Sequence, residues 1–257
     1  MHHHDWLEDA ATRRRAASAL KWSIGITAAL YVIPFGSLLA YPLLLLSTLF
    51  HELGHGAVAI ATGGSFESLA IYADGSGVAS HRSSAEAWVH AATAAGGLVG
   101  PAVIAALAFV AGRSFRGARV FMALIAITLA VALALVIRNG FGVAFVGVII
   151  AAAAWLAVRG SAKVVQLGTV FLATQLALSV FSRADYLFTE VAHTGMGAMP
   201  SDTALIASAL GGTYWMWGLA CGAFSLAVLA GGARWFLRAL RRPGGGGLAG
   251  LPPRPRV

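Results

Sequence analysis

Residues 42–62, which read PLLLLSTLFHELGHGAVAIAT, decide how this chain can fold. The segment is apolar on both sides of one polar group, HELGH at 51–55, and Glu52 is its single charged residue. A helix of about 20 apolar residues is long enough to cross a hydrocarbon layer of roughly 30 Å. The segment therefore predicts a membrane-spanning helix from Pro42 to Thr62 that carries polar side chains at mid-depth.

The rest of the chain has the same character. Of its 257 residues 58% are hydrophobic and 11% charged, whereas about 25% are charged in a soluble domain. The charges leave long uncharged runs, each close to the length of a membrane span. These runs are 22–51, 87–112, 120–137, 139–158, 164–182 and 203–233.

From these runs and the helix breaks we predict an all-α polytopic membrane protein with about seven transmembrane helices. The spans are expected at 22–40, 42–62, 88–111, 119–137, 141–158, 163–184 and 211–232. Asp74-Gly75 lies between two strand-like runs after the second span, which predicts a small β-hairpin there. Ser201-Asp202 has the pattern of a helix start, with Ser201 as the cap of a short helix ending at Leu210.

The expected organisation is a basic amino-terminal segment (1–21), a membrane-embedded domain (22–232) and a basic tail rich in Gly and Pro (233–257). The net charge of +8 comes from residues between spans and in the tail. Attraction to the lipid bilayer and orientation in the membrane explain such residues. We expect no nucleic-acid partner, and the sequence does not indicate an oligomeric state.

The group at 51–55 is an H-E-x-x-H motif. Residues four apart lie on one face of a helix, so His51 and His55 can bind one zinc ion, and Glu52 lies beside it as a general base. Random placement of the chain's His and Glu residues would give about 0.005 such motifs. A purely structural polar cluster is the other alternative, but Ser, Thr or Asn can hold membrane helices together without a carboxylate.

Catalytic zinc usually has three protein ligands and one open position. We predict Asp185 as the third ligand, because four crossings after the second span bring it to the membrane face near His55. Asp74 and Asp202 fall on the same face but rank lower, since the turn and the helix start already explain them. His81, His90 and His193 are further candidates.

Residues 50–56 (FHELGHG) and 62–64 (TGG) resemble the site-2 protease family of intramembrane zinc metalloproteases, and above all its small bacterial "M50B-like" branch. The likeness covers about residues 40 to 230. It includes 74–77, 95–101, 138–139, 141–142 and 201–204. It implies zinc held by His51, His55 and Asp185, with Glu52 as the catalytic base. Asp185 stands before Tyr186-Leu187, whereas the family usually has Asn-Pro-Asp-Gly or Leu-Asp-Gly.

The resemblance implies an integral membrane protein of a bacterial cell membrane that cuts membrane proteins or peptides in or near their spans. The alternative is a non-proteolytic scaffold with a structural or degenerate zinc site. A metal transporter is disfavoured, because the spans contain few polar residues along a pathway.

The orientation in the membrane stays open. With seven spans the face opposite the amino terminus has more Lys and Arg, which places the amino terminus outside. The resemblance implies zinc nearer the cytosolic face, which places the amino terminus inside.

Overall fold

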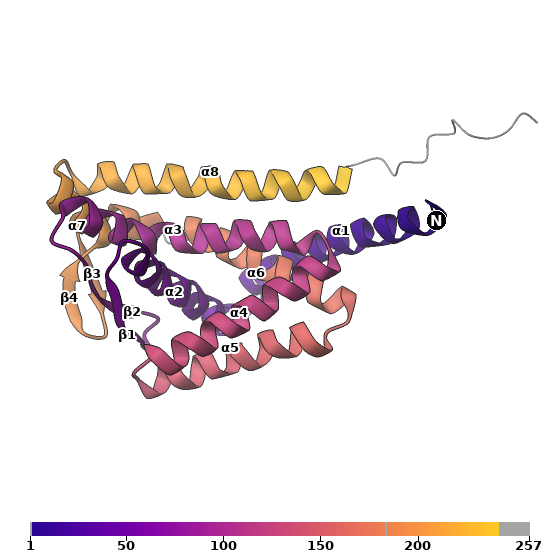
Figure 1. The fold of residues 1–257 in the computed structure, drawn as a ribbon, viewed down its shortest axis with the longest axis horizontal. Coiled ribbons are helices and arrows are strands. Elements are labelled where there is room, and N and C mark those ends of the chain that lie inside the picture. Colours follow the sequence, from indigo (N-terminus) through magenta and orange to yellow (C-terminus); the bar gives the residue numbers. More distant parts are fainter. Residues whose placement is uncertain (1, 183, 242–257) are drawn as a thin grey trace, which may run out of the picture.

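The computed structural model describes residues 2–182 and 184–241, which form a bundle of long helices with two hairpins at one end (Figure 1). The long helices among these residues are α1 (His2–Val32), α2 (Gly36–Ala61), α3 (Ala87–Gly112), α4 (Phe115–Leu135), α5 (Gly140–Arg159), α6 (Ala162–Ser182) and α8 (Tyr214–Arg241). The short elements are β1 (Ser65–Ile71), β2 (Gly77–Arg82), η1 (Ala184–Phe188), β3 (Val191–Thr194), β4 (Gly197–Pro200) and α7 (Asp202–Leu210). The predicted helical membrane fold is confirmed, as is the hairpin between its second and third helices.

Six helices in the described part of the chain are long and apolar enough to cross a membrane: α2, α3, α4, α5, α6 and α8. The spans predicted from residue 88 onward coincide with α3 to α6 and α8 within a few residues, except that α8 continues to Arg241. The chain is therefore an integral membrane protein.

The amino-terminal region differs from the prediction. The expected break between residues 40 and 42 does not form, and the chain turns instead at 33–35, where Phe35 has a left-handed conformation (φ 61°). α1 joins the apolar residues 22–32 to the basic residues before them, and it is not among the six spans. Pro42 lies inside α2, and the preceding helix ends at Val32, two residues before Pro34.

α2 and α3 approach each other along a line of glycines. A Cβ added at Gly54 would lie 2.2 Å from the Gly96 carbonyl oxygen, and one at Gly100 would lie 2.8 Å from the Phe50 carbonyl oxygen. Only glycine fits such contacts, and small residues commonly bring membrane helices this close. This contact fixes the position of the HELGH turn against α3.

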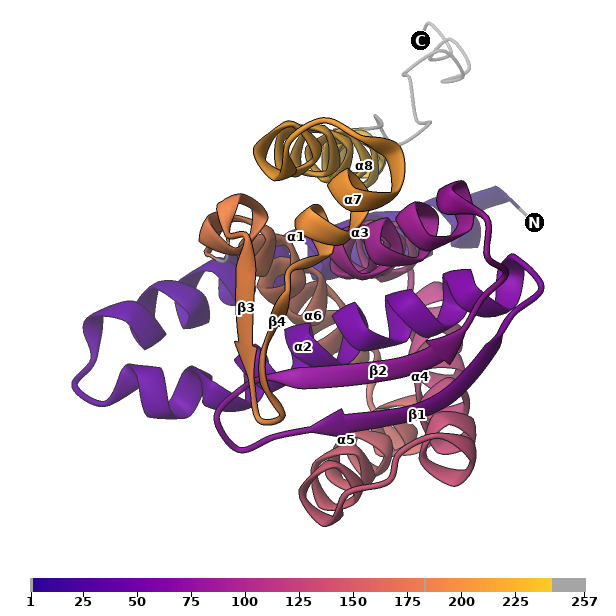
Figure 2. The same ribbon diagram turned by 90° about the vertical axis from the view of Figure 1, so that its left-hand side faces the viewer.

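The β1–β2 hairpin lies alongside α2 (Figure 2). Its turn is closed by Asp74, whose Oδ1 accepts hydrogen bonds from the Ser76 N–H (2.8 Å) and hydroxyl (2.7 Å). The outer edge of β1 is covered, because Leu69 N–H donates to Val136 O (2.8 Å) and Arg138 N–H donates to Leu69 O (3.1 Å). In the described part of the chain β2 pairs with no further strand and forms the outer edge of this sheet.

The second hairpin, β3–β4, was not predicted. It crosses the first one near its turn (Figure 2). The backbone N–H of Gly195, at the tip, donates to Ser76 Oγ at 2.9 Å, and its Cα packs against the Tyr72 ring. α7 follows directly, and Ser201 caps it by accepting from Ala204 N–H, as predicted.

The bundle has two distinct ends (Figure 1). We call one the hairpin end, because β1 to β4, η1 and α7 lie there. We call the other the terminal end, because the start of α1 and the last turns of α8 both lie there. An even number of spans places these two segments on the same side of the membrane, in agreement with the six helices above.

Candidate metal centre

Two imidazoles meet on one face of α2. His51 and His55 are four residues apart, and their Nε2 atoms lie 3.2 Å from each other with the rings nearly perpendicular. His55 is buried, and the side chain of His51 is 19% exposed. The helical spacing of the motif thus gives the convergence that the sequence predicts.

The first residue of α7 completes this group. Asp202 Oδ2 lies 3.0 Å from His51 Nε2, and its Oδ1 lies 3.4 Å from His55 Nε2. One ligand atom from each of these three side chains lies within 4.8 Å of the others, so together they could hold a metal ion. Capping by Ser201 holds Asp202 in this position at the start of the helix.

Glu52 lies next to this group and is buried. Its side chain passes against β2, where a Cβ added at Gly77 would lie 2.7 Å from Glu52 Cγ and 3.0 Å from Glu52 Oε1. The backbone of Ala79 hydrogen-bonds the carboxyl group. Glu52 therefore lies between the histidines and the outer edge of β2.

The neighbours of the ligand atoms fix their orientation. His55 Nδ1 lies 2.8 Å from the Thr93 carbonyl oxygen, which can only accept, so this nitrogen is the donor and Nε2 is free to bind a cation. Gly97 leaves room for the ring, since a Cβ there would lie 2.2 Å from His55 Nε2. On the other side the Tyr186 hydroxyl donates to Asp202 Oδ2 at 3.4 Å.

Asp202 is charged in this setting. Burial by itself would raise the pKa of its carboxyl group, but the neighbouring imidazoles of His55 and His51 hold that pKa well below its usual range. A divalent cation bound to neutral imidazoles would replace their protons and stabilise the anionic carboxylate in the same way.

The group opens into a cavity of ≈ 670 Å³ at the hairpin end. Its walls come from α2, β2, the start of α3, the second hairpin and α7. His81 and His90 line it, and the ring of His81 is nearly parallel to that of His55 with centroids 6.3 Å apart. The cavity is large enough for several residues of an extended chain.

The other predicted site residues have different outcomes. Asp185 belongs to η1, but its side chain lies outside the described residues, so its role as third ligand stays a prediction. His81, His90 and His193 are not part of the metal group formed by the described residues. Asp74 closes the hairpin turn, as expected.

The structure brings Asp202 to the two histidines, although it was expected to rank below Asp185 as a ligand. It is both a first-turn residue and a neighbour of the histidines, and its lying on the same membrane face as His55 was the available signal. Thr93 and Tyr186, which orient the ligand atoms, gave no signal in the sequence, because their contacts depend on packing between distant segments.

Comparison with known families agrees with this geometry. No curated protein and no solved structure matches the chain. The family model described as "Peptidase M50B-like" matches residues 22–232, which include α2, both hairpins and α7. With the metal group and most of the chain inside the match, the protein belongs to the Peptidase M50B-like family of membrane metallopeptidases.

Proposed function

We propose that this protein is an intramembrane zinc metalloprotease that hydrolyses peptide bonds in or near membrane-spanning segments of other proteins. The observation that carries the proposal is the convergence of His51, His55 and Asp202 beside the buried Glu52. The resemblance to the small bacterial branch supports a bacterial cell membrane as its location.

The donor atoms fit zinc. Ligands about 2.1 Å from a tetrahedral zinc ion lie roughly 3.4 Å apart. His51 Nε2 lies 3.2 Å from His55 Nε2 and 3.0 Å from Asp202 Oδ2, whereas His55 Nε2 lies 3.4 Å from the other carboxylate oxygen, Asp202 Oδ1. With one oxygen taken from Asp202, the three ligand atoms lie within 4.8 Å of one another. Two imidazoles and one carboxylate form a ligand set common in catalytic zinc sites, which keep a fourth position open. The cavity beside His51, His55 and Asp202 supports such an open position.

Zinc in this site would supply the Lewis acidity that makes water a nucleophile at neutral pH and polarises a peptide carbonyl. Residues of the chain itself transfer the proton and orient the ligands. Glu52 takes the proton of the attacking water on its carboxylate and passes it to the leaving amine. Thr93 keeps His55 in the required tautomer through Nδ1.

The substrate must be extended at the scissile bond, because a helix hides its carbonyls in its own hydrogen bonds. Among the described residues β2 pairs with no strand other than β1, so an extended segment can add along its outer edge, where the Ala79 backbone hydrogen-bonds Glu52. Gly77, Val78, Ala79 and His81 of this strand line the cavity, and Glu52 lies against Gly77. A segment bound there would run past the metal group.

Replacement of Glu52 by Gln tests the proposal. The variant keeps the size of the side chain but removes the base, so cleavage of a fluorogenic transmembrane peptide should fall by at least about 1,000-fold while zinc content stays at one per chain. Glu67→Gln is the matched control, since Glu67 is on β1 and pairs with Arg82 away from the site. Full activity of Glu52→Gln would contradict the proposal.

A further inference from the structure

The positive charges of the chain gather at one end of the bundle. Twelve described Lys and Arg residues are in the middle of α1, in or next to the α3–α4 and α5–α6 connections, and in the last turns of α8. They are Arg13, Arg14, Arg15, Lys21, Arg113, Arg116, Arg119, Arg159, Lys163, Arg234, Arg238 and Arg241. At the hairpin end the described residues include two, Arg82 and Arg138.

Contacts between these segments show that they belong to one surface. Arg15 Nε donates to Gln166 Oε1 at 3.2 Å, and Gln166 Nε2 donates to Gly112 O at 3.1 Å. These bonds join the middle of α1 to the start of α6 and the end of α3. Arg113 lies over the Trp235 ring of α8, 5.5 Å from its centroid. Arg119 Nη2 donates to Gly160 O at 3.3 Å, at the end of α5.

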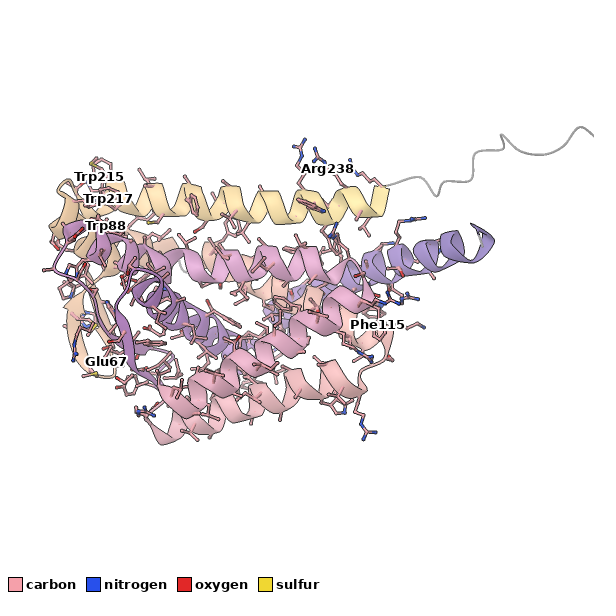
Figure 3. All side chains as sticks on the ribbon, viewed as in Figure 1. Glu67, Trp88, Phe115, Trp215, Trp217 and Arg238 are labelled. Carbon is pink, nitrogen blue, oxygen red and sulfur yellow. The ribbon has the colours of Figure 1, made fainter. Side chains whose placement is uncertain are left out.

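The two ends of the molecule are therefore chemically different (Figure 3). Arg238 and Phe115 mark the terminal end, whereas Trp88, Trp215, Trp217 and Glu67 mark the end with the metal group. Tryptophans are common at a membrane–water boundary on either side, so they do not distinguish the two faces. The Lys and Arg residues do distinguish them, because they are on short connections close to the spans.

The position of α1 determines on which face of the membrane the basic residues 13–21 lie. With 22–40 as a separate span, the basic residues 13–21 fall on the face of Arg82 and Arg138. In the structure they are on the opposite face, together with the basic connections and the end of α8, because α1 and α2 do not form two full crossings.

We propose that the terminal end lies against the anionic lipid headgroups of the cytoplasmic leaflet, so that the cavity and the metal group open near the opposite, extracytoplasmic face. Lys and Arg in short connections are retained on the cytoplasmic side, where anionic lipid also attracts them. This orientation agrees with the family resemblance in placing the amino terminus inside, but it places the metal group at the face opposite to the one that the resemblance implies.

The orientation also limits the substrates, and this part rests on the proposed function. A membrane protein would be cut where its span leaves the bilayer on the extracytoplasmic side, because the cavity lies between α2 and the hairpins at that end. Reporters with the same span and a cleavable segment at one end or the other should differ, with cleavage of the extracytoplasmic version at least about tenfold faster.

Single cysteines test the orientation without reference to activity. In a Cys221→Ser background, Ser84→Cys places a thiol in the loop between β2 and α3, and Ser161→Cys places one in the loop between α5 and α6; both serines are exposed. A membrane-impermeant maleimide added to intact cells should label position 84, and position 161 only after permeabilisation. Labelling of position 161 in intact cells, alone or together with 84, would overturn the proposal.

A second measurement does not depend on these substitutions. A fluorescent protein or an alkaline phosphatase is fused to the carboxyl end of the full chain. We expect fluorescence and no phosphatase activity, because the end of α8 faces the cytoplasm. Active phosphatase would overturn the orientation and would leave the proposed proteolysis untouched, whereas loss of cleavage with correct labelling would contradict only the proteolysis.

Discussion

At the scale of single residues, the site depends on three polar side chains, and burying any one of them alone would cost free energy. A charged group in the interior of a membrane has to be paired or bound to a cation. Asp202 and the two histidines compensate one another at 3.0 to 3.4 Å, and a divalent cation between them would compensate all three. Thr93 and Tyr186 hold the ligand atoms in orientation, as neighbours of metal ligands commonly do.

Asp202→Asn should weaken zinc binding by more than about 100-fold, because loss of a direct ligand costs more than the 10- to 100-fold typical of its neighbours. Zinc content after dialysis measures this. Asp185→Asn is the matched comparison, since both residues follow α6 and precede α8. Retention of zinc by Asp202→Asn together with its loss from Asp185→Asn would identify Asp185 as the ligand and exclude Asp202.

At the scale of elements, the site is made where α2, α3 and α7 meet. α2 provides two histidines and Glu52, α7 provides Asp202, and α3 provides the surface on which the His55 ring rests. The close approach of α2 and α3 depends on Gly54, Gly96 and Gly97. These glycines are structural residues with a direct effect on the metal group.

Gly97→Ala should lower zinc affinity by about tenfold or more, because the new methyl group occupies the place of the His55 ring. Titration against a zinc chelator measures the change. Gly231→Ala in α8 is the control, since a Cβ there meets nothing within 4 Å, and its affinity should be unchanged. Equal affinity for Gly97→Ala and the wild type would mean that the ring can move without loss of ligation.

At the scale of the whole molecule, the apolar core and the metal group are largely separate. The main cluster of buried apolar residues extends through α1 to α6 and α8, whereas the metal group joins α2 to α7 at one end. The fold is therefore expected to be stable without the ion, and the ion is expected to serve the reaction.

Removal of zinc by a chelator should abolish cleavage and leave the helical signal in circular dichroism unchanged, and added Zn²⁺ should restore cleavage. Helical content and activity are measured on the same sample in detergent. A large loss of helix on chelation would instead indicate a structural metal, as expected for a non-proteolytic scaffold.

Much of this protein follows from local sequence. The length of the uncharged runs predicts the spans, Asp74-Gly75 predicts the first hairpin, and Ser201 predicts the start of α7, because each depends on neighbours in the chain. The four-residue spacing of His51 and His55 gives their convergence for the same reason. The break at 33–35 was missed because Pro34 and Pro42 are both compatible with a helix boundary, and packing decides between them.

The partner of the histidines was decided only by the tertiary structure. Asp202 is about 150 residues from His51, and its approach requires η1, the second hairpin and the close contact of α2 with α3. The local sequence around Asp202 predicts a helix start. It contains no information about which other helix lies next to that start. The clustering of positive charge at the terminal end was also decided only by the tertiary structure. The packing of α1 against α6 brings the basic residues of α1 close to those of the α3–α4 and α5–α6 connections.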